Sequence, residues 1–281
     1  MYERQETAPA RNFKVKAGIL QKMLLGLLIP SIIVLIIVGM MLNRDVDEVV
    51  ITLNNDYLTS EANAAARELD THFQRYMGIA TTSSQTDDLR RRLNGWTTNF
   101  QGISQYTELT TLLDNVKTSD SSINLVWLCN VRNGEILQSD GVHVDASDAN
   151  AASRPWYSQV VDGQKLVVTG AYEDRVTGGL IVTFATPVIE NGEVVGILGL
   201  DVMLDTFLAE IAQISVGETG YMTVFDNEGN VIYHPDESLI LKNAADIDYT
   251  EDMKEVILEN RTVDAMQYTR NNTVYHGSTV A

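Results

Sequence analysis

The sequence predicts an α+β protein in which two long helical stretches precede a series of short antiparallel strands. Residues 23–43 carry no charge, and residues 44–84 repeat apolar side chains at helical spacing. After residue 121 the pattern changes to short apolar runs separated by Asn and Gly turns. These three observations predict a membrane-spanning helix, then a stalk helix, and then antiparallel sheets.

The 21 uncharged residues at 23–43 are long enough to cross a bilayer as one helix, at roughly 31 Å. A cleaved signal peptide is the alternative, but its apolar region is shorter and ends at a small-residue cleavage site, which is missing here. Basic side chains precede the span at Arg4, Arg11, Lys14, Lys16 and Lys22. We therefore expect a protein of the cell membrane, with residues 1–22 cytoplasmic and the residues after 43 extracytoplasmic.

The stretch at 44–84 is predicted to form a stalk helix. Val46, Val50 and Leu53 begin a series of apolar positions that recur every three to five residues as far as Ala80. No Gly or Pro interrupts the series before Gly78. An apolar stripe on a long helix favours pairing with a second copy, so we expect a homodimer.

Four turn sequences divide the remaining chain into hairpins: Asn133-Gly134, Asn191-Gly192, Gly229-Asn230 and Asn271-Asn272. Such turns between β-prone runs predict hairpins, because the tight turn needs positive φ at both positions. The first and third hairpins superpose at an offset of 95 residues, which indicates two related modules. We expect a larger module at 85–215 and a smaller one at 216–281, which lacks its last strand.

Charge and the reactive side chains argue against several functions. The net charge is −18, and such a surface repels a phosphate backbone, so no nucleic-acid partner is expected. The histidines His72, His143, His234 and His276 show no metal-ligand spacing, and no nucleophile elbow or phosphate-binding loop is present. The single cysteine, Cys129, lies in an apolar run and is expected to be buried. The sequence therefore predicts no catalytic residue, no metal and no cofactor, and it disfavours an enzyme.

The segment at 153–204 combines side chains that suit a small zwitterion. An arginine clamps a carboxylate, aromatic rings wall a pocket, and aspartates accept hydrogen bonds from an ammonium group. The alternative is an internal ion pair between the arginine and an aspartate, with the rings as core. The residue types alone leave both interpretations open. The candidate ligand-binding residues are Arg154, Trp156, Tyr157, Tyr172, Asp174 and Asp201.

These residues resemble the double Cache (dCache) sensory domain of bacterial methyl-accepting chemotaxis receptors, in the form that binds amino acids or amines. The spacing agrees with that family, with 16 residues from Trp156 to Tyr172 and 27 from Asp174 to Asp201. The resemblance covers roughly residues 44–281. It rests on Arg154-x-Trp156-Tyr157, Tyr172-x-Asp174, Thr177-Gly178, Pro187, Gly196 and Asp201-x-x-Leu204.

The resemblance implies two PAS-like modules after the long helix, with the ligand in the membrane-distal module. The first three candidate residues would contact the carboxylate end of the ligand, and the last three would receive its ammonium group. One position departs from the family pattern, because Ala149 stands where a tyrosine is expected, five residues before Arg154. The ligand class therefore stays open between an amino acid and an amine. The resemblance also implies a second membrane span and a cytoplasmic signalling helix, so we expect this chain to be truncated.

The expected function is that of the extracytoplasmic sensing region of a transmembrane chemoreceptor, which binds a small amino acid or amine and signals across the membrane. Its partners would be that small molecule, the membrane and a second copy of the chain. The same sensor attached to a histidine kinase or a cyclic-nucleotide enzyme is one alternative. A surface protein that is anchored in the membrane and binds no ligand is the other.

Overall fold

The computed structural model describes residues 18–96, 104–149, 151–174, 178–214 and 216–281. The predicted cytoplasmic segment as far as residue 17, and the motif residue Thr177, lie outside the described residues. The chain divides into two compact units, Met1–Asn54 and Asn55–Ala281. All strands of the described residues belong to the second unit.

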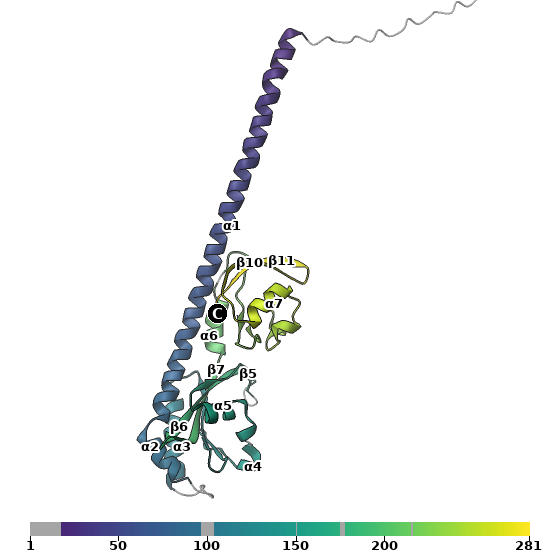
Figure 1. The fold of residues 1–281 in the computed structure, drawn as a ribbon. Helices are drawn as coiled ribbons and strands as arrows, with labels where there is room; N and C mark the ends of the chain where they lie inside the picture. Colours follow the sequence, from purple (N-terminus) through teal and green to yellow (C-terminus); the bar gives the residue numbers. More distant parts are fainter. Residues whose placement is uncertain (1–17, 97–103, 150, 175–177, 215) are drawn as a thin grey trace, which may run out of the picture. The chain divides into compact units, whose positions relative to one another are not determined.

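Helix α1 (Ile19–Ser84) contains both of the predicted helical stretches (Figure 1). Its segment Lys22–Met41 has a mean hydropathy of 2.8 and, by length and composition, is able to cross a membrane. No other helix of the described residues passes that test. Pro30 lies inside the helix, which is tolerated within a membrane span.

The second unit is α+β, as predicted, and its larger sheet has seven strands. Their order is β3-β2-β1-β7-β6-β4, with β5 paired to β6, and every pairing is antiparallel. The strands are β1 (Ile123–Asn130), β2 (Ile136–Gln138), β3 (His143–Val144), β4 (Val167–Val168), β5 (Tyr172–Glu173), β6 (Leu180–Glu190) and β7 (Glu193–Met203). The short helices around them are α2 (Asp87–Asn94), α3 (Ser104–Lys117), α4 (Ala146–Ala149), η1 (Ala151–Ser153), α5 (Pro155–Gly163) and α6 (Asp205–Ala212).

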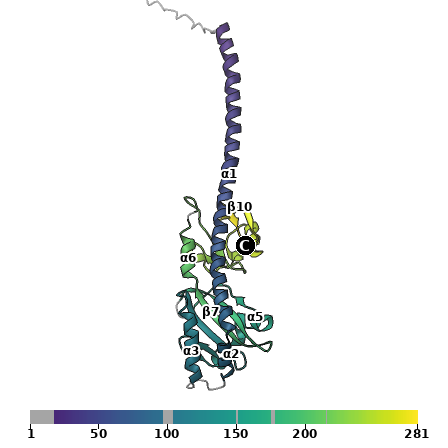
Figure 2. The same ribbon diagram turned by 90° about the vertical axis from the view of Figure 1, so that its left-hand side faces the viewer.

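Different helices cover the two faces of this sheet, and strand alternation decides which side chains meet them. Along β1, Val126 and Leu128 belong to a core that they share with α1, α2 and α3. Trp127 and Cys129 point the other way, into a second core that includes Trp156 of α5. Figures 1 and 2 both place α5 on the side of β7 opposite α3. Cys129 is fully buried, as expected.

The C-terminal part of the second unit repeats the order of hairpin, helix and hairpin. Strand β9 corresponds to β2 at the predicted offset of 95 residues, and α7 corresponds to α5 at nearly the same offset. A third apolar core, which includes Val231, Tyr249 and Met253, lies among these elements. The elements are β8 (Val224–Phe225), β9 (Val231–Tyr233), η2 (Glu237–Leu239), η3 (Ala244–Asp246), α7 (Glu251–Leu258), β10 (Val263–Arg270) and β11 (Thr273–Thr279).

All four predicted hairpins are confirmed, but their turns differ in backbone conformation. Both residues of the 191–192 turn and both residues of the 271–272 turn have positive φ, as a type I′ turn demands. At the other two turns only the glycines Gly134 and Gly229 have positive φ. The expectation of positive φ at both positions was therefore wrong for those two turns, where one left-handed glycine closes the hairpin.

Candidate functional site

Asp201 is a buried acid on the central strand β7, with 8% of its surface exposed. The strand runs from residue 193 to 203 with eight consecutive buried positions, so its backbone is held on both sides. Asp201 and Ile197 are four residues apart on β7, so their side chains point to the same face of the sheet. Ile197 lies in the core on the α5 side. The carboxylate of Asp201 therefore points toward the face that α5 covers.

The Asp201 carboxylate is held by two hydrogen bonds from neighbouring strands. The Trp127 indole donates from Nε1 to Oδ1 at 3.1 Å, and the Thr183 hydroxyl donates to the same oxygen at 2.7 Å. Thr183 has one hydroxyl proton, and that proton goes to Asp201. The Tyr172 hydroxyl, 2.6 Å from the Thr183 oxygen, must therefore be the donor in that contact. Tyr172, Thr183, Asp201 and Trp127 form one chain of hydrogen bonds.

Burial raises the pKa of Asp201 from its usual 3.8 to about 6. The hydrogen bonds from Thr183 and Trp127 oppose that shift, because both stabilise the ionised form. Asp174 adds to the shift through charge repulsion, whereas Arg154 opposes it through attraction. The two candidate charges are therefore close enough to influence Asp201, and the carboxylate carries its negative charge at a desolvation cost.

Tyr172 is an exposed residue whose hydroxyl contacts a buried one. The side chain is at the end of a short strand and the residue is 41% exposed, but its oxygen lies against Thr183, which is fully buried. Burial raises the pKa of Tyr172 to about 12, and the negative charge of Asp201 contributes to the shift. The phenol therefore stays a hydrogen-bond donor at neutral pH.

A layer of indole rings covers this network. The ring centroids of Trp127 and Trp156 lie 4.5 Å apart at 34°, and Tyr157 lies 6.0 Å from Trp156. The Trp127 ring packs directly over Gly199, its partner on β7, where a Cβ atom would come within 2.0 Å of the ring. The glycine makes room for the indole, and the indole reaches Asp201 from there.

Arg154 is placed at the start of α5 by the residue that follows it. Pro155 occupies the first helical position, where its fixed φ favours helix initiation and its missing N–H costs nothing. Arg154 is the preceding cap residue, with extended backbone and an exposed side chain. No hydrogen bond or ion pair of its guanidinium is present among the described residues. The predicted alternative, an internal ion pair with an aspartate, is therefore not seen within that part of the chain.

Asp174 follows β5 and is half-buried. Its backbone N–H donates to Gly179 at 2.8 Å, which closes the loop that carries it. Asn124 donates from Nδ2 to a carboxylate oxygen at 3.2 Å. The side chain is therefore oriented by the neighbouring strand β1 while part of it stays open to solvent.

The structure brings several of the six predicted residues together around β7. Asp201 and Tyr172 are joined through Thr183, while Trp156 packs on the ring of Trp127, and the charges of Arg154 and Asp174 act on Asp201. Sequence reasoning missed Trp127, Thr183 and Asn124. The signal for Trp127 was its place in an apolar strand, where an indole N–H needs a buried acceptor.

A separate cavity of about 390 Å³ lies in the second unit between α1 and the C-terminal elements. Tyr221, Tyr249, Tyr268 and Tyr275 contribute to its lining, together with Glu61 of α1. None of the six predicted residues lines it among the described residues. The lining also includes one acidic and one basic side chain, Glu61 and Arg261, whereas the six predicted residues gather around Asp201.

Replacing Thr183 with valine is expected to raise the pKa of Asp201 above about 6. The variant keeps the shape of the side chain but removes the hydroxyl that donates to the carboxylate at 2.7 Å. A ¹³C NMR titration of the aspartate carboxyl groups measures the change. Thr186→Val is the matched control, because Thr186 is also buried on β6 and does not contact Asp201. An unchanged Asp201 titration in Thr183→Val would contradict the hydrogen-bond assignment.

Comparison with known proteins identifies the domain family of the chain. The sequence model of the Cache domain family, in its dCache_1 form, matches residues 44–279. The methyl-accepting chemotaxis protein McpA of Pseudomonas putida is 32% identical over 199 residues, which are 70% of this chain and 30% of that receptor. Adenylate cyclase 1 of Rhizobium meliloti is 30% identical over 104 residues, which are 37% of this chain and 15% of the cyclase. The matched residues thus span less than a third of the length of these relatives.

Solved structures with the same fold are ligand-binding domains of chemoreceptors. The domain of Campylobacter jejuni Tlp3 in complex with 4-methylisoleucine has a TM-score of 0.61 at 16% identity, covering 81% of this chain and 86% of that one. The domain of Pseudomonas fluorescens CtaA in complex with L-isoleucine has a TM-score of 0.59 at 18% identity, covering 82% and 86%. At such identities the likeness concerns the fold. Together with the match over residues 44–279, it establishes that this chain belongs to the Cache domain family.

Proposed function

We propose that this chain is the extracytoplasmic sensing region of a membrane-anchored chemoreceptor and that it binds a small amino acid or amine. The ligand binds in the predicted distal module, residues 85–215, over β7. The first part of α1 spans the membrane with the N-terminus in the cytoplasm. Signals leave the second unit through α1, and the chain acts as a homodimer.

The observation that carries the proposal is the buried carboxylate of Asp201. It is 8% exposed, it accepts hydrogen bonds from Trp127 and Thr183, and its pKa is raised to about 6. Among the described residues it forms no ion pair with a lysine or arginine. A buried acid that is charged at neutral pH gains most from a cation that reaches it. An ammonium group of a ligand supplies that cation.

The surrounding side chains fit the other parts of such a ligand. Asp174 provides a second, partly exposed carboxylate for the ammonium group, and Arg154 provides a guanidinium suited to a carboxylate. Trp156 and Tyr157 supply apolar walls with polar edges beside them. The Tyr172 hydroxyl completes the ammonium end of the site. Tlp3 and CtaA, whose domains have this fold, bind amino acids according to their complexes, which supports an amino-acid or amine ligand.

Binding of an ammonium ligand is expected to weaken as the pH falls below about 6. The ligand needs the ionised Asp201, whose pKa in the free protein is about 6, so affinity declines by about tenfold per pH unit once the acid is protonated. Stability follows the opposite trend. The folded chain holds this proton more tightly than the unfolded chain, so the contribution to the unfolding free energy falls as the pH rises from 3.8 to about 6. Calorimetry between pH 5 and 8 measures the affinity, and a flat profile would contradict the proposal.

A thermal-shift screen of the full chain in detergent micelles tests the proposed ligand class. The panel contains amino acids, their decarboxylated amines and their des-amino organic acids as matched sets. A ligand at 100 times its dissociation constant stabilises the fold by about 2.7 kcal/mol, which is readily detected. We expect a rise in melting temperature from members that carry an ammonium group. Shifts from organic acids alone would refute the assignment of the aspartates, and a panel without any shift would favour the anchored surface protein.

A second candidate places the same sensor on a cyclic-nucleotide enzyme. The similarity to adenylate cyclase 1 of Rhizobium meliloti favours it, although that similarity covers 37% of this chain. The two candidates share the site and differ in the output, so a measurement of cyclic AMP against swimming bias in cells that carry the whole gene product separates them. The sensing region itself is proposed to bind its ligand without converting it. Recovery of the unchanged ligand after incubation checks that point.

A further inference from the structure

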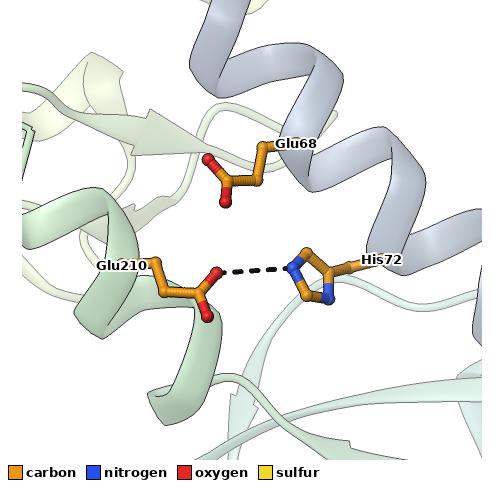
Figure 3. Close-up of side chains that lie close together, drawn as sticks. All are labelled: Glu68, His72 and Glu210. Carbon is orange, nitrogen blue, oxygen red and sulfur yellow. Dashed lines mark ion pairs between the residues drawn. The ribbon is translucent and has the colours of Figure 1, made fainter.

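Three metal-binding side chains converge where α1 and α6 meet, away from the site around Asp201 (Figure 3). Glu68 and His72 come from α1, and Glu210 comes from α6. The nearest available ligand atoms of the three all lie within 4.8 Å of one another. His72 Nε2 lies 3.5 Å from Glu210 Oε2.

The helices present these side chains to the same point. Glu68 and His72 are four residues apart, so they lie one above the other on one face of α1. Helix α6 is anchored by the buried side chains Leu208 and Ile211, which leaves Glu210 between them exposed. His72 and Glu210 have side chains that are 27% and 47% exposed. An ion from solvent can therefore reach all three groups.

The cluster carries more negative than positive charge. The two glutamates bring two negative charges to one point, and the single imidazole of His72 can offset at most one of them. Among the described residues, no lysine or arginine forms an ion pair with Glu68 or with Glu210. Like charges held this closely repel each other, and a divalent cation would convert that repulsion into attraction.

We propose that Glu68, His72 and Glu210 form a binding site for a divalent transition-metal ion of the Zn²⁺ type. One imidazole nitrogen with two carboxylate oxygens is a donor set that such ions accept, whereas Ca²⁺ and Mg²⁺ require oxygen ligands. Ligand bonds of about 2.0–2.1 Å place neighbouring donor atoms of a tetrahedral ion roughly 3.3 Å apart. The 3.5 Å between His72 and Glu210 is close to that value. Small rotations of the exposed carboxylate of Glu68 bring the third donor in, and water fills the remaining position.

A second cluster, which also has two carboxylates and one imidazole, offers a comparison. Glu135, His143 and Asp145 also bring ligand atoms within 4.8 Å. There the Glu135 carboxylate is buried and already accepts hydrogen bonds from Trp96 and Asn133, each at 2.8 Å. The Glu135 carboxylate therefore has a structural role, and a metal ion bound there would displace its hydrogen bonds from Trp96 and Asn133. His143 is therefore a suitable control for His72.

Zinc titration of the tag-free full chain in detergent micelles, after treatment with a chelator, tests the site. We expect calorimetry to show one Zn²⁺ per chain and a higher melting temperature, because the ion links α1 to α6. His72→Gln should lower the affinity by at least about tenfold, since even groups that only support a metal ligand contribute that much. Glu210→Gln should lower it in the same direction. His143→Gln and His276→Gln, which change a histidine outside the site, should leave the affinity unchanged.

Circular dichroism and the melting temperature without zinc show whether each variant is folded, and Glu210→Gln alters a side chain that is 47% exposed. A chain that binds no Zn²⁺, or binds it equally well in wild type and His72→Gln, would overturn the proposal. Loss of binding in His143→Gln instead would assign the ion to the other cluster and would overturn it as well. Equal binding of Mg²⁺ or Ca²⁺ would contradict the proposed metal class.

Discussion

Asp201→Asn is expected to remove amine or amino-acid binding while the fold stays at least as stable as wild type. The amide keeps the shape of the side chain and an acceptor for the Trp127 indole, but it has no charge for the ligand's ammonium group. Loss of one partner from a buried, hydrogen-bonded charge pair costs about 2–5 kcal/mol of binding, or roughly 30-fold to several thousandfold in affinity. Calorimetry at pH 7.5 measures that loss.

Stability should respond in the opposite direction. Burial raises the pKa of Asp201 to about 6, so at pH 7.5 the folded protein carries a charge that it holds unfavourably. The neutral amide removes that cost, and the melting temperature without ligand should stay equal or rise. Asp205→Asn is the matched control, because Asp205 is exposed at the start of α6 and carries the same charge. Tight amine binding by Asp201→Asn, or loss of binding in the control, would contradict the role assigned to Asp201.

Gly199→Ala should destabilise the protein and abolish ligand binding together. A Cβ atom at Gly199 would lie 2.0, 2.1 and 2.6 Å from three atoms of the Trp127 ring. The ring cannot move away easily, because Trp156 packs on it at 4.5 Å and its indole N–H is bonded to Asp201. Overpacking of this kind costs about 1–3 kcal/mol, and displacement of the ring removes a support of the ligand site as well. Chemical denaturation measures the loss.

Two further variants give this prediction its controls. Gly78→Ala, in α1, places its Cβ where nothing lies within 4 Å, and an alanine is favoured inside a helix, so stability should rise slightly. Trp127→Leu combined with Gly199→Ala removes the collision and should be less destabilised than the sum of the two single variants. A Gly199→Ala protein as stable as wild type would show that the indole does not need the space above the glycine.

Much of the fold follows from local sequence patterns. The stalk part of helix α1 follows from apolar spacing that no Gly or Pro interrupts before Gly78, and the four hairpins follow from their Asn and Gly turns. The internal repeat at an offset of 95 residues predicted a strand at the position of β9 that corresponds to β2. Helices α2 and α3 were not predicted, since short helices are stabilised mainly by the core that they cover. The order of the seven strands depends on long-range pairing, which no local pattern specifies.

The candidate site shows the same division between local and long-range information. Residue chemistry and spacing pointed to Asp201. The pairing of Asp201 with Thr183, however, depends on a β-bulge. The turn at 191–192 alone would pair Asp201 with Val182. An extra residue, Val195, shifts the register after Ile189, so Thr183 lies opposite Asp201. The convergence of Glu68 and His72 on Glu210 likewise depends on packing between helices that are far apart in sequence.

A crystal structure of the chain with the strongest ligand from the thermal-shift screen tests the central claim most directly. The account predicts the ammonium group within about 3 Å of the carboxylates of Asp201 and Asp174, with any carboxylate of the ligand toward Arg154. The indole layer of Trp127 and Trp156 should lie alongside it. A ligand found instead in the 390 Å³ cavity beside Tyr221 and Tyr249 would contradict the account, because the buried charge of Asp201 would then have no part in recognition.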